Sequence, residues 1–202
     1  VALLTAAVLS WLWVPAEAQT LGQVFKRVSA SVVVVRTREK EVGARGQGQT
    51  VNISGVGSGV LISADGKVMT AAHLVHTADE ISAEFLDGEI VGARVIASEP
   101  EADVSLLQLE RMPPRAVVAK LGDSDKVDVG DQVFIVGAPY GIGHTLSVGH
   151  ISARHKPNTV YSGFSLAEFL QTGAAINQGN SGGPMFSMAG EVIGIVSHII
   201  SK

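Results

Sequence analysis

Residues 179–184 read Gly-Asn-Ser-Gly-Gly-Pro, and the fold prediction starts from this stretch. A serine hydroxyl is a poor nucleophile unless a base takes its proton and donors stabilise the oxyanion that its attack creates. Glycines on both sides let the backbone turn sharply, so that the N–H groups of Gly179 and Ser181 can converge on one point. The alternative is an ordinary glycine-rich turn, which the strand patterns on both sides disfavour. Ser181 is therefore the candidate nucleophile, and Gly179 and Ser181 form the candidate oxyanion hole.

A candidate base for this serine ends an earlier strand pattern, in the stretch TAAH at residues 70–73. The two alanines before His73 are small enough to let another backbone pack closely. The chain has six histidines, and His76 is the obvious rival. His73 and His76 could also form a metal pair, but no third ligand follows at a helpful spacing and no HExxH motif occurs. We therefore predict His73 as the base and no metal site.

A candidate partner for the histidine is Asp103, which stands directly before the apolar pattern Val104–Leu109. A carboxylate at such a place tends to be partly buried and must then be paired. The alternative is an ordinary turn at the start of a strand. Asp103 would not be singled out alone, but it gains weight beside His73 and Ser181.

Short strand patterns separated by turn signals fill most of the chain, and only residues 21–27 favour a helix. Thr37–Gly55 is polar and glycine-rich, which predicts a surface loop. Asp65-Gly66 and Asp87-Gly88 predict tight hairpin turns. The first series of predicted strands is Ser31–Arg36, Gly57–Ile62, Lys67–Thr70, Glu80–Phe85, Glu89–Ser98 and Val104–Leu109. About six strands suit a small antiparallel barrel, here residues 19–110.

A proline pair interrupts the strand patterns at residues 113 and 114 and cannot lie inside a sheet, because it removes two hydrogen-bond donors. We interpret residues 111–116 as a link between two units. The second series of predicted strands, in residues 117–202, is Val117–Leu121, Gln132–Gly137, Leu146–Ala153, Phe169–Thr172, Pro184–Ser187 and Glu191–Ile199. The fold class predicted from these patterns is all-β.

The composition excludes several classes of protein. The formal net charge is −4, so no basic face is expected for nucleic acid. The chain has no cysteine, which excludes disulfides, thiolate metal sites and a cysteine nucleophile.

The first residues resemble an export signal. Residues 1–14 are apolar apart from Thr5 and Ser10, and Ala16-Glu17-Ala18 supplies small residues suited to cleavage. The stretch is short for a membrane span of roughly 20 residues. We predict a signal peptide at residues 1–18 that lacks its basic leader, and a periplasmic or secreted protein. The alternatives are a buried helix or an uncleaved anchor, which would be the only contact with a membrane.

Together the motifs resemble the chymotrypsin-like proteases, and more closely the HtrA (DegP-like) family. GSGVLISADGKVMTAAHLV at 57–75, ADVSLLQL at 102–109 and LQTGAAINQGNSGGPMFSMAGEVIGIVSHII at 170–200 carry the resemblance, with LGDSDKVDVGDQVFIVGAPYG at 121–141. The candidate residues follow the order His, Asp, Ser, at spacings of 30 and 78 residues. The match covers roughly residue 28 to the end of the chain.

The resemblance implies two six-stranded antiparallel barrels with His73, Asp103 and Ser181 as a catalytic triad in the cleft between them. It also implies a serine endopeptidase that cleaves unfolded or damaged polypeptides through an acyl-enzyme, with no cofactor, and a possible homotrimer. The alternative is a catalytically silent or chaperone-like subunit that binds proteins in the same cleft. The family continues further than Lys202, so we expect a second barrel without its last strand and no PDZ domain in this chain.

The family also implies where the specificity pocket lies. The stretch six residues before the nucleophile forms the pocket floor in such enzymes, and residues 173–176 (GAAI) carry no charge here. We assign the pocket to Ala175, Ile176, Val196, Ser197 and His198. An apolar pocket narrowed by isoleucine predicts cleavage after Val, Ala or Ile rather than after Lys or Arg.

Overall fold

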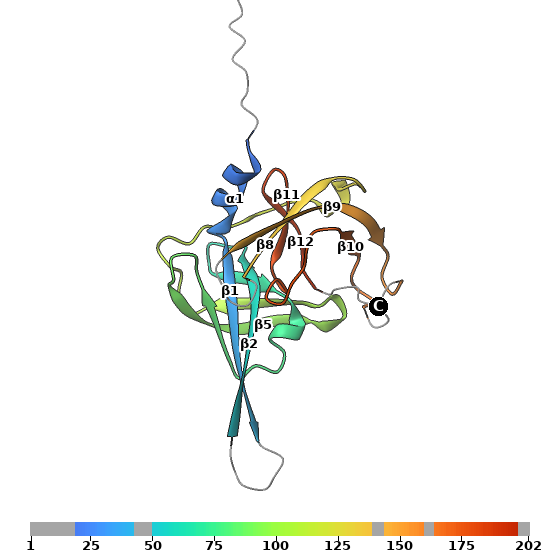
Figure 1. Cartoon of the computed structure of the whole chain (residues 1–202). Helices are drawn as coiled ribbons and strands as arrows, with labels where there is room; N and C mark the ends of the chain where they lie inside the picture. The colour runs from blue at the N-terminus through green and yellow to red at the C-terminus, as the bar shows by residue number, and fades with distance from the viewer. Residues whose placement is uncertain (1–18, 43–49, 139–143, 160–163, 198–202) are drawn as a thin grey trace, which may run out of the picture.

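The computed structural model describes residues 19–42, 50–138, 144–159 and 164–197. The predicted signal peptide at residues 1–18 and His198 of the predicted pocket lie outside these ranges. The described part of the chain is mostly strand, as predicted, and it begins with one helix (Figure 1). Among these residues, no helix combines the length and the hydropathy needed to cross a membrane.

The first six strands close into a barrel in the order β1-β2-β3-β6-β5-β4, which confirms the predicted six-stranded barrel. All its strand pairs are antiparallel. Burial alternates along β6, so Ser105, Leu107 and Leu109 face the interior. The predicted turns follow β2 and β4, where Gly66 and Gly88 adopt φ of 87° and 85°. The strands are β1 (Val32–Val42), β2 (Thr50–Leu61), β3 (Lys67–Thr70), β4 (Glu80–Glu84), β5 (Ile90–Glu99) and β6 (Val104–Leu109).

The loop predicted at Thr37–Gly55 is wrong for its described residues. β1 and β2 stay paired out to Val42 and Thr50 and form a long hairpin that projects from the barrel (Figure 1). Polar composition misled the prediction because both faces of a projecting hairpin can be solvated. Cross-strand ion pairs also support it, since Arg38 Nη1 lies 2.9 Å from Glu80 Oε2 on β4.

The second six strands form an open sheet in the order β10-β9-β8-β11-β12-β7. The β7–β12 pair is parallel, whereas the prediction was antiparallel pairing throughout. No tight hairpin joins these two strands, so the chain is free to run in either direction there. The predicted strand Val117–Leu121 shrinks to two residues. The strands are β7 (Lys120–Leu121), β8 (Gln132–Gly137), β9 (Thr145–His155), β10 (Phe169–Thr172), β11 (Pro184–Ser187) and β12 (Glu191–Ile195).

Strand β8 is buried on both faces, which explains its unbroken apolar run. Val133 and Ile135 face a core within the second sheet. Phe134 and Val136 face a second core that includes Val32 and Val60 of the first barrel. Phe134 stacks on Phe186 of β11 with ring centroids 5.3 Å apart. This shared core holds the first barrel and the second sheet together.

The helix α1 (Leu21–Ser29) closes one side of this shared core, as the spacing of its apolar residues predicts. A capping box begins it: the Gln23 amide donates to Thr20 Oγ1 at 3.3 Å, and the Thr20 amide donates to Gln23 Oε1 at 2.8 Å. Val24 and Val28 are buried against the second sheet.

Candidate active site

His73 and Asp103 lie in contact although 30 residues separate them in the sequence. His73 lies in a single 3-10 turn, η1 (Ala72–Leu74), directly after β3. Its Nδ1 lies 2.9 Å from Asp103 Oδ2, and its backbone amide donates to Asp103 Oδ1 at 3.0 Å. The His73 side chain is 39% exposed and the Asp103 side chain 3% exposed. The carboxylate therefore orients the imidazole ring from the buried side.

Asp103 follows the 3-10 turn η2 (Pro100–Ala102) and adopts a left-handed backbone conformation, with φ 51° and ψ 41°. This conformation is uncommon outside glycine, and Asp and Asn are among the residues that tolerate it. The Ala72 amide donates to the Asp103 carbonyl oxygen at 3.2 Å. Both the backbone and the side chain of Asp103 are thus tied to the segment that carries His73.

Burial alone would raise the pKa of the Asp103 carboxyl. Hydrogen bonds from the His73 ring, the Ser197 hydroxyl and the His73 amide outweigh that effect and hold the pKa below its ordinary value. Asp103 is therefore ionised at neutral pH.

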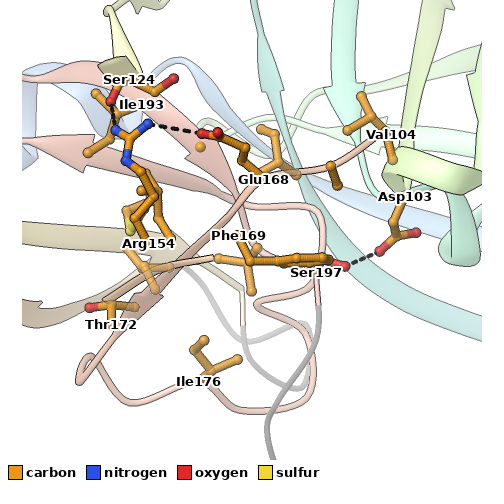
Figure 2. Close-up of a pocket in the computed structure, with 18 of the residues that line it drawn as sticks. Asp103, Val104, Ser124, Arg154, Glu168, Phe169, Thr172, Ile176, Ile193 and Ser197 are labelled. Carbon is orange, nitrogen blue, oxygen red and sulfur yellow. Dashed lines mark hydrogen bonds and ion pairs between the residues drawn. The ribbon is translucent and has the colours of Figure 1, made fainter. Parts of the chain in front are cut away.

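The hydrogen bond from Ser197 Oγ to Asp103 Oδ2 was not predicted from the sequence (Figure 2). The sequence assigns Ser197 to the specificity pocket only. It follows β12 and reaches Asp103 across the boundary between sheet and barrel. No signal in the sequence places a residue 94 positions away beside Asp103.

The glycine-rich loop at 179–183 packs directly against the segment that leads to His73. Gly182 has φ 77°, and a β-carbon there would overlap Thr70 Oγ1 and the Ser58 carbonyl oxygen and lie 2.9 Å from the Ala71 amide nitrogen. Only glycine fits such an approach. The loop and the TAAH segment, which belong to different sheets, are therefore in contact.

Ser181 itself is partly buried and is bonded to the barrel through its backbone. Its carbonyl oxygen accepts a hydrogen bond from the Ser58 amide of β2 at 2.8 Å. A β-carbon at the neighbouring Gly57 would lie 3.0 Å from that oxygen and would overlap the Leu74 side chain. Gly179, the other predicted oxyanion donor, is buried and has φ 98°.

The backbone of Val196 pairs with the same glycine-rich loop. The Gly182 amide donates to the Val196 carbonyl oxygen at 2.7 Å, and the Val196 amide donates to the Gly183 carbonyl oxygen at 2.8 Å. The loop is therefore held from both sides, by β2 of the barrel and by the segment that follows β12.

A pocket of about 410 Å³ adjoins Asp103 (Figure 2). Three of the predicted pocket residues line it, namely Ile176, Val196 and Ser197. Ala175 does not: it is exposed, because the side chains of an extended segment alternate and its neighbours Ala174 and Ile176 face inward.

The pocket also contains charge, which the uncharged stretch at 173–176 did not predict. Arg154 of β9 reaches into its wall, and its Nη1 lies 3.0 Å from Glu168 Oε2 (Figure 2). The Arg154 guanidinium also donates to the carbonyl oxygens of Ser124 and Val127. Arg154 Nη1 also lies 3.5 Å from Asp125 Oδ1, so two carboxylates compensate the charge of this guanidinium. Across the described ranges, no three His, Asp or Glu side chains gather to hold a metal ion.

Comparisons with known proteins identify the family. A model of the trypsin-like peptidase domain matches residues 57–195. A probable periplasmic serine endoprotease, DegP-like, of Pseudomonas putida strain GB-1 is 42% identical over 151 residues, which cover 73% of this chain and 30% of that protein. A probable periplasmic serine protease, do/HhoA-like, of Haemophilus influenzae is 39% identical over 163 residues, covering 80% and 34%. The chain thus spans about a third of the length of these relatives.

Solved structures show the same likeness. The HtrA-type protease AlgW with a tripeptide has a TM-score of 0.75 and 32% identity, with 88% of this chain and 54% of that one covered. AlgW with a decapeptide has a TM-score of 0.78 and 29% identity, with 91% and 60% covered. The predicted chymotrypsin-like fold and the predicted resemblance are confirmed: the chain belongs to the HtrA (DegP-like) family of trypsin-like serine endoproteases.

Proposed function

We propose that this chain carries the catalytic unit of a periplasmic serine endopeptidase, with Ser181 as nucleophile, His73 as base and Asp103 as its partner. The observation that supports this most is the contact of His73 with the buried Asp103, at a site where the Ser181 loop packs against the same segment. The periplasmic location rests on the names of the relatives.

In the proposed mechanism Ser181 Oγ attacks the carbonyl carbon of the scissile peptide bond. Because His73 Nδ1 faces Asp103, Nε2 is the nitrogen that takes the serine proton and later gives it to the leaving amine. Asp103 stabilises the imidazolium that forms. The amides of Gly179 and Ser181 stabilise the oxyanion. A water molecule, activated by His73, then releases the acyl group.

The proposed substrates are unfolded or damaged polypeptides, and quality control of exported proteins is the proposed role. Peptide-bound structures of the HtrA-type relative support a polypeptide ligand. We keep the signal peptide at 1–18, the second barrel extended by further chain, the homotrimer and a PDZ domain elsewhere in the protein as proposals of the same kind. The alternative, a chaperone-like subunit without catalysis, would use the same cleft but would not be acylated.

Labelling by a fluorophosphonate probe, which phosphonylates an activated serine with loss of fluoride, tests this function. The wild-type protein should be labelled at Ser181 and should degrade casein, and Ser181→Ala should do neither while its circular dichroism stays unchanged. Loss of the nucleophile typically costs several orders of magnitude in turnover. Equal casein degradation by both proteins, or a wild-type protein that binds casein without labelling, would contradict the proposal.

A further inference from the structure

Ser58 lies on β2, outside the predicted triad. It nevertheless bonds the glycine-rich loop through both its side chain and its backbone. It is fully buried. Its hydroxyl donates to the carbonyl oxygen of Gly179 at 2.6 Å and accepts from the amide of Ala138 at 3.0 Å. The hydrogen-bonding of this buried hydroxyl is thus satisfied on both sides, by two different segments of the second sheet.

The backbone of Ser58 makes two further bonds into the same site. Its amide donates to the Ser181 carbonyl oxygen at 2.8 Å. Its carbonyl oxygen accepts from Thr70 Oγ1 at 2.7 Å, three residues before His73. One residue of the barrel is therefore bonded to both residues whose amides form the proposed oxyanion hole, and to the strand that carries the base.

The bond to the Gly179 carbonyl matters because glycine, without a β-carbon, restricts its backbone dihedral angles less than any other residue does. Gly179 has φ 98°, a region where rotation of its peptide planes meets little steric resistance. The plane between Gly179 and Asn180 is held at two points: Ser58 Oγ holds its carbonyl, and its N–H donates to Asn177 within the same loop at 3.0 Å. Among the bonds of the described residues, the Ser58 bond is the one that anchors this plane to the barrel.

We propose that Ser58 is a positioning residue for catalysis: its hydroxyl fixes the Gly179–Asn180 peptide plane and so aims the flanking amides of Gly179 and Ser181 at the oxyanion. The inference rests on the proposed endopeptidase function. Ser58 does not touch the reacting atoms. Its contribution is the preorganisation of donors that would otherwise have to be reoriented during each turnover.

The test compares Ser58→Ala with Ser31→Ala in the purified protein. Ser31, in the turn before β1, is a matched control, since it is also a buried serine whose hydroxyl donates to a carbonyl oxygen at 2.6 Å, that of Val28. Removal of an oxyanion donor costs ~10²–10³ in turnover, so misdirecting one should lower kcat by about 10- to 100-fold. KM for a peptide substrate and the pH midpoint of kcat/KM should stay unchanged, because substrate contacts and His73 are unaltered.

A second measurement separates positioning from loss of stability. A peptidyl trifluoromethyl ketone forms a hemiketal whose oxyanion occupies the hole, so Ser58→Ala should weaken its inhibition by the same factor as kcat. Ser31→Ala should match the wild type in both kcat and inhibition, even if it melts earlier. If Ser58→Ala does not fold, Ser58→Cys, whose thiol is a weaker donor, should fold and show a smaller fall in kcat.

A kcat of Ser58→Ala equal to that of Ser31→Ala, or an effect confined to KM, would overturn the proposal, as would a Ser58→Cys protein with wild-type kcat. A wild-type protein that the fluorophosphonate does not label would instead defeat the endopeptidase function. The two failures are therefore distinguishable.

Discussion

At the scale of single residues, Asp103 combines an uncommon backbone conformation with three donors on one carboxylate, from the His73 ring, the His73 amide and the Ser197 hydroxyl. Its position before a strand suggested burial and pairing. The left-handed backbone and Ser197 were not predictable, because both depend on how η2 and the end of β12 meet.

Asp103→Asn should lower kcat by roughly 10⁴-fold, because an amide would stabilise the wrong tautomer of His73. The fold should persist, since Asn also tolerates the left-handed region. Steady-state kinetics and circular dichroism check this. Asp87→Asn, an exposed carboxylate in the turn after β4, is the control and should match the wild type. A fall of less than about tenfold would exclude Asp103 as the partner of the base.

The same variant carries a prediction for stability against pH. The pKa of Asp103 is lowered in the folded protein, so its ionised form stabilises the fold at every pH above the unfolded value of ~3.9. This contribution is lost as pH falls through the lower folded pKa. The difference in unfolding free energy between wild type and Asp103→Asn should therefore be constant from pH 7 to about pH 5 and shrink below about pH 4. Denaturant titrations across this range measure it.

Asn180 is a second residue whose environment gives a test. It is 3% exposed, and among the described residues its Oδ1 has no hydrogen-bond partner. Asn180→Asp would place a buried carboxylate there. The site is tightly packed, since a β-carbon added at Gly137 would lie only 2.5 Å from Asn180 Oδ1. An unpaired buried charge is expensive, so the variant should melt earlier than the wild type at pH 7. The gap should narrow toward pH 4, where the acid becomes neutral; a constant gap would contradict this reason.

At the scale of elements, the contact of the glycine-rich loop with β2 and β3 assembles the site. Sequence patterns located β3 and several other strands closely: β3, β6, β8, β10 and β11 have the predicted bounds, whereas β2 begins earlier than predicted. The approach of the loop to β2 and β3 was not predictable from those patterns. It depends on the absence of a side chain at Gly182, where two backbones and Thr70 meet.

Gly182→Ala should abolish activity and lower stability, because the added methyl would meet Ser58 and Thr70 as well as strain the backbone. Gly130→Ala separates the two causes. Gly130 also has positive φ, 101°, but nothing lies within 4 Å of its would-be β-carbon. It should lose about 1 kcal/mol through backbone strain alone and keep its activity. Thermal melts and casein assays on both variants measure stability and activity. Equal losses in the two variants would show that the close approach of Gly182 to Ser58 and Thr70 is unimportant.

At the scale of the whole molecule, the pocket joins the two halves. Ala102, Asp103 and Val104 come from the barrel side, while Ile176, Val196 and Arg154 come from the second sheet. The lining of this pocket is therefore a property of the assembled fold rather than of the stretch before Ser181.

We expect cleavage after Val, Ala or Ile, because apolar side chains dominate the pocket near Ile176 and Arg154 is already paired with Glu168. Ile176→Ala should widen the pocket and shift cleavage toward Leu and Phe. Ala175→Ser, at the exposed neighbouring position, should leave the preference unchanged. Peptide-library digests read by mass spectrometry measure the preference. Cleavage mainly after Lys or Arg would show that the specificity pocket is not formed by these residues.

The sequence by itself determined the all-β class and most strand positions, and it singled out His73, Asp103 and Ser181 as the candidate residues. These follow from local signals: alternation of apolar residues, turn dipeptides, and motifs in which neighbouring residues serve one chemistry. Tertiary structure alone decided the projecting hairpin, the parallel β7–β12 pair, the exposure of Ala175, the charge in the pocket and the bonds of Ser58 and Ser197. The parallel pair, the pocket charge and the bonds of Ser58 and Ser197 join residues far apart in the chain, and one sequence carries no local record of which distant groups meet.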